Sequence, residues 1–200
     1  MKFLTLEGVD GAGKSSHIEF IADAIRSKGA HVIVTREPGG TELAERLRQT
    51  ILNHSMSPIL ETLLIFAART DHVERVIRPA LASGQWVICD RFTDATAAYQ
   101  GAGNGVSADL IARLAEAAHP GLRPTRTLLF DCPYEVASAR LAKAGRALDR
   151  FEREDRAFFE RVRGTYLAIA KAEPERLVVI DASRDAQAVR DQIKTALAGL

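Results

Sequence analysis

The sequence predicts an α/β fold, in which helices cover both faces of one parallel sheet. Five short apolar runs rich in branched residues are expected to form strands, at residues 2–7, 31–36, 86–90, 126–131 and 177–181. Longer segments with helical spacing of apolar residues separate these runs, and this alternation favours βαβ crossovers. A chain of 200 residues is about one domain long, so we expect a single doubly wound unit spanning the whole chain.

The segments between the expected strands show the periodicity of amphipathic helices. Ile18, Ile21 and Ile25 lie on one helical face after the first strand, and the last segment of the chain repeats this spacing. Residues 58–83 form a long helical stretch without the change in composition that would mark a linker. No internal repeat divides the chain, so the helices are expected to pack around one sheet.

The carboxyl ends of the expected strands carry charged residues. Runs stop at such residues at Glu7, Arg36, Asp90 and Asp131. In open parallel sheets, ligands bind in the crevice outside these strand ends. The sequence therefore predicts one active edge.

Composition excludes several classes of protein. Lys and Arg total 27 against 26 for Asp and Glu, so the net charge of +1 provides no broad basic field for nucleic acid. No apolar stretch approaches the roughly 20 residues of a membrane helix, and the N-terminus lacks a signal-peptide pattern. Cys89 and Cys132 fit no metal or redox spacing and are expected to be small buried hydrophobes. We expect a cytoplasmic protein that binds neither nucleic acid nor membrane.

A glycine-rich segment follows the first expected strand. Residues 8–15, GVDGAGKS, match G-x-x-x-x-G-K-[ST] and lead into a helix-forming segment. Glycines let backbone amides surround phosphate, Lys14 neutralises phosphate charge, and the Ser15 hydroxyl can bind Mg²⁺. The motif predicts a P-loop site for a nucleoside triphosphate. The residues expected to line it are Gly8, Val9, Asp10, Gly11, Ala12, Gly13, Lys14, Ser15 and Ser16.

A P-loop alone does not separate kinases from GTPases or other ATPases. The guanine-reading sequence N-K-x-D is absent, because neither Asn53 nor Asn104 precedes a lysine. No D-x-x-G follows the loop either. Both observations disfavour a GTPase.

Two further segments offer side chains suited to a nucleobase. Phe66 and Arg69 are three residues apart on an expected helix and so face the same way, which places an apolar surface beside a planar cation. Thr96, Tyr99 and Gln100 share another helical face and supply two hydroxyls and an amide. Such a pocket suits a pyrimidine nucleotide. The alternative is that these residues are core or surface-pair residues.

Taken together, these segments resemble the thymidylate kinase family, and bacterial members are the most similar. The resemblance extends over nearly the whole chain and is carried by TREPGGT at 35–41, FAAR at 66–69, DRF at 90–92, ATAAYQ at 95–100 and DRFE at 149–152. It implies a nucleoside monophosphate kinase fold with a five-stranded parallel sheet. It also implies transfer of the γ-phosphate of ATP to dTMP, giving dTDP and ADP, and a homodimer.

The resemblance implies a role for each acceptor residue. By this analogy, Phe66 stacks on thymine, Arg69 donates to its O4, Thr96 and Gln100 meet the edge near N3, and Tyr99 lies against the sugar. Two arginines, Arg36 and Arg48, would hold the phosphate of dTMP, with Arg46 as a nearby alternative.

Transfer to a phosphate monoester needs no general base, because the attacking oxygen is already anionic. The site must instead neutralise charge, a role that fits Lys14, Mg²⁺ and Arg91. Asp90 is expected to orient the metal through water, and Asp10 to contact the sugar 3′-hydroxyl or the metal region, as the matching family positions do.

A lid is expected at residues 142–153. Members of the family carry a further catalytic arginine either in the P-loop or on a lid, and residues 10–12 contain none. We therefore expect Arg146 or Arg150 to close over the phosphates. The alternative is a solvated helix start, since the chain uses 21 arginines against 6 lysines.

Two rival functions remain open from the sequence. One is a kinase for another pyrimidine nucleotide or for a nucleoside, which would need a carboxylate base beside the 5′-hydroxyl. The other is a nucleotide-dependent switch that serves a protein partner.

Overall fold

The computed structural model describes residues 2–143, 145, 147 and 149–198. Its centre is a five-stranded parallel sheet with the strand order β2-β3-β1-β4-β5. The strands lie within one residue of the expected runs, and the α/β prediction is confirmed. Their bounds are β1 Phe3–Glu7, β2 Val32–Arg36, β3 Trp86–Asp90, β4 Arg126–Asp131 and β5 Leu177–Asp181.

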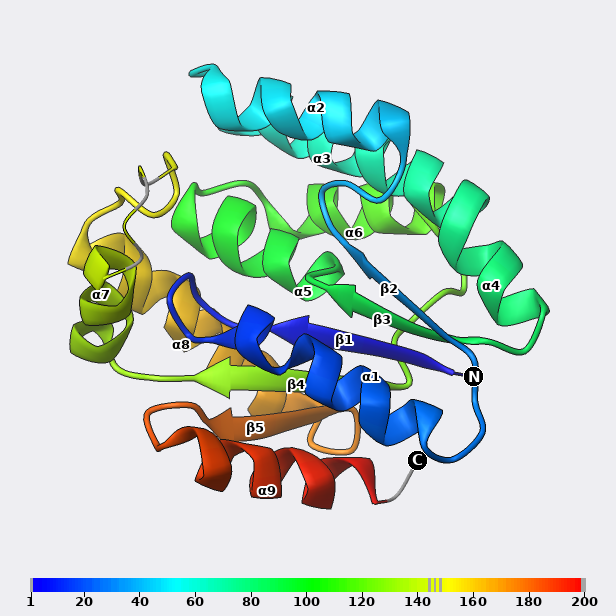
Figure 1. Ribbon diagram of the computed structural model, residues 1–200. Helices are drawn as coiled ribbons and strands as arrows, with labels where there is room; N and C mark the ends of the chain where they lie inside the picture. The colour runs from blue at the N-terminus through cyan, green and yellow to red at the C-terminus, as the bar shows by residue number, and fades with distance from the viewer. Residues whose placement is uncertain (1, 144, 146, 148, 199–200) are drawn as a thin grey trace.

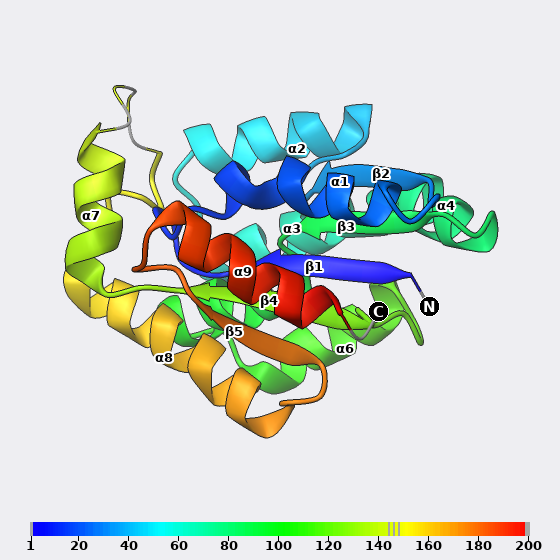
Figure 2. The same ribbon diagram turned by 60° about the horizontal axis from the view of Figure 1, so that its bottom comes forward.

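Helices cover both faces of the sheet (Figures 1 and 2). Helices α1 and α9 cover one face, α5, α6 and α8 cover the other, and α2 and α3 lie side by side beyond β2. The helical bounds are η1 Lys14–His17, α1 Ile18–Arg26, α2 Glu42–Asn53, α3 Pro58–His72, η2 Val73–Ile77, α4 Arg78–Ala82, α5 Thr93–Thr96, η3 Ala97–Gly103, α6 Ala108–Ala118, α7 Tyr134–Lys143, α8 Arg156–Ala172 and α9 Ala186–Leu197.

The central strand β1 is buried along its whole length. A parallel strand covered on both faces needs near-continuous apolar residues, and Phe3, Leu4 and Leu6 have no exposed surface. The polar exception is satisfied within the sheet, because the hydroxyl of Thr5 lies 2.7 Å from that of Thr127 on β4. The sheet is therefore a rigid base for the loops at its edge.

Strand register brings the charged strand ends together. Asp90 on β3 lies opposite Leu6 of β1 on one side and Arg36 of β2 on the other. The fourth charged end, Asp131, is instead held by Arg163 of α8 through two hydrogen bonds of 2.7 and 2.9 Å. The charged ends of β1, β2 and β3 thus lie next to one another at one edge of the sheet.

Other expectations from composition can be compared with the fold. Cys89 and Cys132 are both buried and unpaired, as expected of small core residues. Among the described residues, no helix is both long and apolar enough to span a bilayer.

Candidate active site

The glycine-rich loop turns sharply between β1 and η1. Gly8, Gly11 and Gly13 have φ angles of 134°, 79° and 91°, which residues with a side chain rarely adopt. A Cβ atom on Gly8 would lie 2.3 Å from the backbone oxygen of Phe130, and one on Gly11 would lie 2.5 Å from that of Ala137. The sequence therefore needs glycine here both for the turn and for the close approach of neighbouring backbone.

Lys14 folds back over the loop. Its buried ammonium donates to the carbonyl oxygens of Gly8, at 2.8 Å, and Val9, at 3.1 Å. Burial lowers the pKa of Lys14, and nearby Arg91 lowers it further. An anion placed in the loop would oppose both effects by stabilising the charged lysine.

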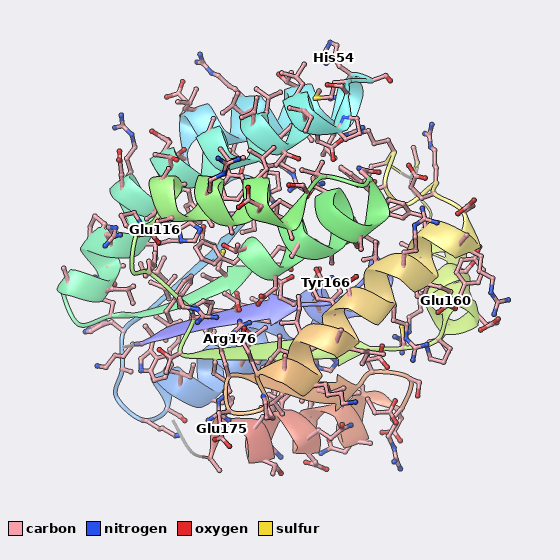
Figure 3. All side chains as sticks on the ribbon, turned by 180° about the vertical axis from the view of Figure 1, so that it is seen from behind. His54, Glu116, Glu160, Tyr166, Glu175 and Arg176 are labelled. Carbon is pink, nitrogen blue, oxygen red and sulfur yellow. The ribbon has the colours of Figure 1, made fainter. Side chains whose placement is uncertain are left out.

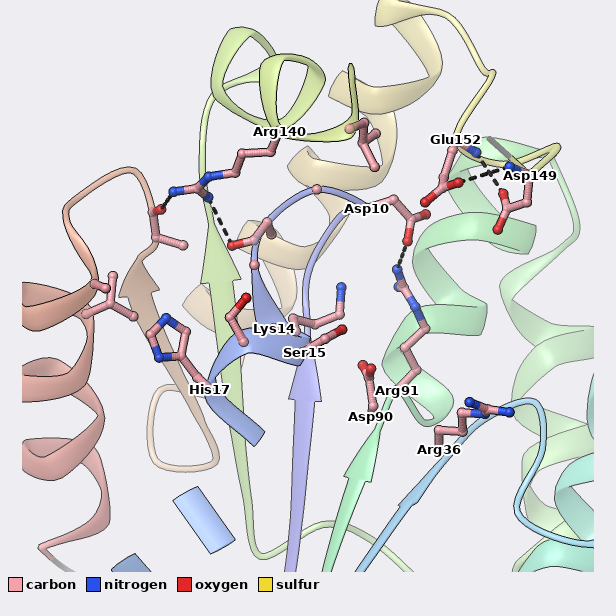
Figure 4. A pocket seen from close by; sticks show the side chains of 18 of the residues that line it. Asp10, Lys14, Ser15, His17, Arg36, Asp90, Arg91, Arg140, Asp149 and Glu152 are labelled. Carbon is pink, nitrogen blue, oxygen red and sulfur yellow. Dashed lines mark hydrogen bonds and ion pairs between the residues drawn. The ribbon is translucent and has the colours of Figure 1, made fainter. Parts of the chain in front are cut away.

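Two oxygen-bearing side chains near Lys14 fit a hard cation. Ser15 and Asp90 line the same cavity (Figure 4), and Asp90 Oδ1 is buried without a hydrogen-bond partner among the described residues. Mg²⁺ is bound in proteins by one or two such oxygens together with water and substrate phosphates. The donor set therefore fits Mg²⁺.

The loop opens into a cavity of about 640 Å³. Its described lining includes Lys14 and five arginines, which come from β2, α2, α7 and the loops after β3 and β5. These arginines are Arg36, Arg48, Arg91, Arg140 and Arg184. Such a concentration of cations, in a chain of net charge +1, indicates a site for several phosphate groups.

Arg91 lies at the centre of a hydrogen-bonded network over the loop. Its guanidinium donates to Asp10, at 2.6 Å, and to the Tyr99 hydroxyl, at 3.1 Å, while Tyr99 donates to the other oxygen of Asp10 at 2.8 Å. Although burial alone would raise the pKa of Asp10, Arg91 and Lys14 hold it below its usual range. The network fixes two charged groups in ionised form at the mouth of the loop.

A buried carboxyl group supports Arg91 from below. Glu7 accepts a hydrogen bond from the Phe92 backbone N–H, at 2.7 Å, and another from the Tyr166 hydroxyl, at 2.8 Å. Tyr166, on α8 at the back of the sheet (Figure 3), also accepts from Arg91 at 3.3 Å. Burial raises the pKa of Glu7 to about 8. Sequence analysis missed Tyr166, because nothing local marks a tyrosine in a distant helix.

A second cavity, of about 90 Å³, lies next to the first. Arg69 lines it and is 2% exposed. Its Nε donates to Glu37, at 2.6 Å, and its Nη2 donates to the hydroxyl of Thr96, at 3.0 Å. Its Nη1 is buried and has no partner among the described residues. A buried free donor in a small cavity is suited to a carbonyl acceptor on a ligand.

Glu37 holds Arg69 in place with help from His72. Burial would raise the pKa of Glu37, but Arg69 and then His72 keep it below its usual range. His72 Nδ1 is 3.0 Å from Glu37, and its Nε2 is 2.7 Å from the hydroxyl of Thr35. Sequence analysis named the segment that contains Glu37 but not this role.

The predicted phosphate-holding arginines lie on the cavity walls. Arg36 pairs with Glu45 at 2.9 Å, and Arg48 donates to the backbone oxygen of Pro38 at 3.0 Å. Arg48 lines both cavities, as a group that holds an acceptor phosphate between base and donor must. The alternative, Arg46, is exposed and pairs with Glu42 on the outer face of α2.

Comparison with known proteins decides the family. A family model described as thymidylate kinase matches residues 6–193. The chain belongs to the thymidylate kinase family. It is 56% identical to the thymidylate kinase of Bordetella petrii, over all of this chain and 96% of that one, and 54% identical to that of Cupriavidus metallidurans, over all of this chain and 98% of that one.

A solved structure agrees with this assignment. The crystal structure of thymidylate kinase from Ehrlichia chaffeensis matches with a TM-score of 0.78 and 32% identity, over 96% of this chain and 97% of that one. Thymidylate kinases phosphorylate dTMP with ATP to give dTDP. The expected family, the nucleoside monophosphate kinase fold and the assignment as an enzyme are confirmed.

The structure corrects the expected role of Phe66. Phe66 is 3% exposed, is packed with Val106 and Ile111, and is not among the described residues that line either cavity. The three-residue spacing does place it against Arg69, whose guanidinium carbon lies 4.8 Å from the ring centroid. Because Arg69 covers that ring, a thymine cannot stack there. The cavity is lined instead by the preceding residue, Ile65.

The predicted lid is only partly described. Arg146 lies outside the described residues. Arg150 forms an ion pair with Glu61 of α3, and its guanidinium lies 4.5 Å from the Phe151 ring centroid. It is not among the described residues that line the larger cavity, so the expected position over the phosphates is not the one seen here. Its pairing with a buried glutamate explains the difference.

Sequence analysis also missed three residues around the phosphate cavity. Arg140 of α7 donates to the backbone oxygens of Ala12, at 3.3 Å, and Ala182, at 2.8 Å, and so joins the loop to the segment after β5 (Figure 4). His17 and Arg184 complete this wall. None belongs to a motif. Only the rule that ligands lie beyond the carboxyl ends of strands pointed to the segments that carry Arg140 and Arg184.

Proposed function

We propose that this chain transfers the γ-phosphate of ATP to dTMP at the junction of the two cavities. The observation that supports the proposal is that the cavities adjoin and share part of their walls: both are lined by Asp10, Glu37, Arg48, Arg91 and Asp149. A donor phosphate in the larger cavity and a base in the smaller one would meet at these residues. This arrangement supports direct transfer between two nucleotides, without a covalent enzyme intermediate.

The donor side holds ATP through the loop. Residues 10–16 line the larger cavity, where their backbone would surround the phosphates and Lys14 would neutralise their charge. Ser15 would hold Mg²⁺ directly and Asp90 would hold it through water. When bound, the metal neutralises phosphate charge and aligns the transferring group.

The acceptor side binds both the base and the phosphate of dTMP. Arg69 donates to thymine O4, Thr96 and Gln100 meet the edge near N3, and Tyr99 closes the space beside the sugar where a 2′-hydroxyl would lie. The acceptor phosphate is held by two arginines of the cavity wall, Arg36 and Arg48.

Transfer itself relies on charge and alignment. The acceptor phosphate oxygen attacks without a general base, because it carries a negative charge. Arg91 and Lys14 stabilise the charge that develops on the transferring group. Asp10 fixes Arg91 and is placed to meet the sugar 3′-hydroxyl or the metal region. The chain acts as one kinase domain whose lid, residues 142–153, brings Arg146 or Arg150 over the phosphates.

The enzyme is proposed to be a homodimer in the cytoplasm. Leu43 on α2 and Ile59, Leu60 and Leu63 on α3 are 45 to 51% exposed, although all are large and apolar. Exposed apolar groups on adjoining helices support a homodimer formed through α2 and α3. ATP and deoxynucleotides are metabolites of the cytoplasm, and we place the enzyme there.

The choice of acceptor tests the proposed function. The purified chain is given Mg²⁺ and a fixed concentration of ATP, with dTMP, dUMP, dCMP or thymidine as acceptor, and nucleotide products are separated by chromatography. We expect dTDP to form fastest. Faster phosphorylation of thymidine would favour a nucleoside kinase. ATP consumption that is independent of every acceptor, or no consumption at all, would favour a nucleotide-dependent switch.

A further inference from the structure

A buried glutamate outside both cavities contacts the residue that reads the base. Glu61, on α3, is 1% exposed and is not among the described residues that line the cavities. One of its oxygens accepts hydrogen bonds from Gln100 Nε2, at 2.7 Å, and from Asn104 Nδ2, at 3.3 Å. Its other oxygen forms the ion pair with Arg150. A glutamate in the carboxylate form can only accept hydrogen bonds.

This contact determines which end of the Gln100 amide faces the cavity. An amide group has a donor end, Nε2, and an acceptor end, Oε1, and the two ends have nearly the same shape. If the amide of Gln100 were reversed, its oxygen would face the carboxylate of Glu61, and two acceptors would repel each other. Nε2 is therefore committed to Glu61, and Oε1 is the atom that Gln100 offers to the cavity.

The resulting pattern of donors and acceptors is complementary to thymine. Thymine presents N3–H, a donor, next to O4, an acceptor. The cavity offers Gln100 Oε1, an acceptor, and Arg69 Nη1, a buried donor with no partner among the described residues. Cytosine has the reverse pattern, with an acceptor at N3 and an amino group at C4. If cytosine occupied this buried site, neither Gln100 nor Arg69 could form its hydrogen bond with the base.

We propose that Glu61 is the positioning residue that sets the preference for thymine over cytosine, by fixing the orientation of the Gln100 amide. The inference rests on the proposed binding of dTMP in the smaller cavity. The carboxylate of Glu61, which does not touch the ligand, would thus determine the hydrogen-bonding pattern of the site. Gln100 alone does not explain its share of the choice, because a free amide can turn over to suit either base.

The test compares the binding of two nucleotides. Dissociation constants for dTMP and dCMP are measured by calorimetry without ATP, for the unaltered chain and for Glu61→Gln. The new amide can donate to Gln100 Oε1 and so allows the Gln100 amide to turn over. We expect the preference for dTMP over dCMP to fall by about tenfold or more. Glu61→Asp, which keeps a carboxylate, retains more of the preference than Glu61→Gln.

Two further variants separate orientation from packing. Asn104→Ala removes the other donor to the same oxygen of Glu61 and is expected to leave the preference within about twofold. Gln100→Met removes both ends of the amide, so it loses the part of the preference that Gln100 supplies and keeps the part that the donor Arg69 supplies. Glu61→Gln is expected to add no further loss in that background. The second comparison shows whether Glu61 acts through Gln100.

Several outcomes would overturn the inference. These are an unchanged preference in folded Glu61→Gln, a loss of affinity that is equal for both nucleotides, and a preference in Gln100→Met that is as large as in the unaltered chain. The last decides the matter even if Glu61→Gln does not fold. If the unaltered chain shows no preference for dTMP, the proposed function fails instead. The two failures are therefore distinguishable.

Discussion

Arg69 is a fully buried cation that is stabilised by the residues around it. Its guanidinium lies between the rings of Phe66 and Phe92, with centroid distances of 4.8 and 5.1 Å, while Glu37 balances its charge. Burying a charge without such a partner would be costly. The contacts leave Nη1 without a partner among the described residues, as the proposed hydrogen bond from Arg69 to a base requires.

Two arginines on α2 give a matched test of the acceptor site. Arg48→Ala removes a cation that lines both cavities, so we expect the KM for dTMP to rise about tenfold or more, with a smaller change in the KM for ATP. Arg46→Ala changes an exposed arginine on the same helix and should leave both constants within about twofold. Steady-state kinetics measure both. Equal effects of the two substitutions would contradict the assigned role of Arg48.

Glu7 gives a prediction for stability against pH. Burial, followed by the charge of Asp94, raises its pKa from 4.5 to about 8, so the folded chain keeps a proton that the unfolded chain loses. Glu7 therefore makes the free energy of unfolding fall as pH rises between about 4.5 and 8, by up to roughly 1.4 kcal/mol per pH unit. Denaturation of the unaltered chain and of Glu7→Gln across this range should show a shallower fall in the variant. Parallel curves would mean that Glu7 is ionised when folded.

At the scale of elements, two glycines with similar backbone angles allow the effect of backbone strain to be measured apart from the effect of a steric clash. Gly11 and Gly29 have φ angles of 79° and 80°, but a Cβ on Gly11 would meet backbone atoms of Ala137, whereas one on Gly29 would meet nothing within 4 Å. We expect Gly29→Ala to lower the free energy of unfolding by about 1 kcal/mol and leave ATP binding unchanged.

Gly11→Ala should carry the same strain and, in addition, push the loop away from α7. The expected result is a loss of ATP affinity of at least about tenfold, measured by calorimetry with ATP and Mg²⁺. Equal ATP affinity in the two variants would show that the loop adapts without losing its shape around phosphate.

The lid segment gives a prediction about catalysis. If an arginine of residues 142–153 closes over the phosphates, Arg146→Ala or Arg150→Ala lowers kcat by orders of magnitude. For Arg150, closure requires release from Glu61. Arg156→Ala, at the exposed start of α8, is the control and should keep kcat within about twofold. Full activity in both lid variants would exclude Arg146 and Arg150 as the catalytic arginine.

The strands and the loop were predictable because their signals are local. Each strand is a short run of branched apolar residues, and the P-loop is one continuous motif. The face of α3 was predicted less well. The spacing of Phe66 and Arg69 correctly placed them in contact, but sequence periodicity does not say on which side of Arg69 the ligand lies. Ile65, one residue earlier, lines the cavity instead.

Contacts between distant elements were beyond sequence reasoning. Tyr166 reaches Glu7 across 159 residues, and Arg140 reaches Ala12 across 128. Glu61 resembles any surface glutamate in the sequence, and only the packing of α3 against η3 shows that it is buried beside Gln100. Sequence motifs identified the side chains expected to touch the substrates. The residues that orient those side chains could be identified only from the tertiary structure.

For the whole molecule, exposed apolar side chains predict the assembly. Leu60→Glu places a charge on the exposed face of α3, and we expect it to convert a dimer into a monomer. Val179→Glu is the control, because Val179 is 44% exposed but lies on the opposite edge strand, β5. Sedimentation equilibrium measures both. A monomeric unaltered chain, or a dimer that Leu60→Glu leaves intact, would contradict assembly through this face.

We propose that the molecule as a whole brings two anionic nucleotides together at one edge of a sheet, so that phosphate passes directly between them. Labelled ATP tests this claim most directly. With ATP carrying ³²P in its γ-phosphate, Mg²⁺ and dTMP, we expect the label to appear in dTDP, with little inorganic phosphate, and no label to become bound to the protein when dTMP is left out. Label bound covalently to the protein without dTMP, or released as inorganic phosphate at the same rate with and without dTMP, would contradict direct transfer.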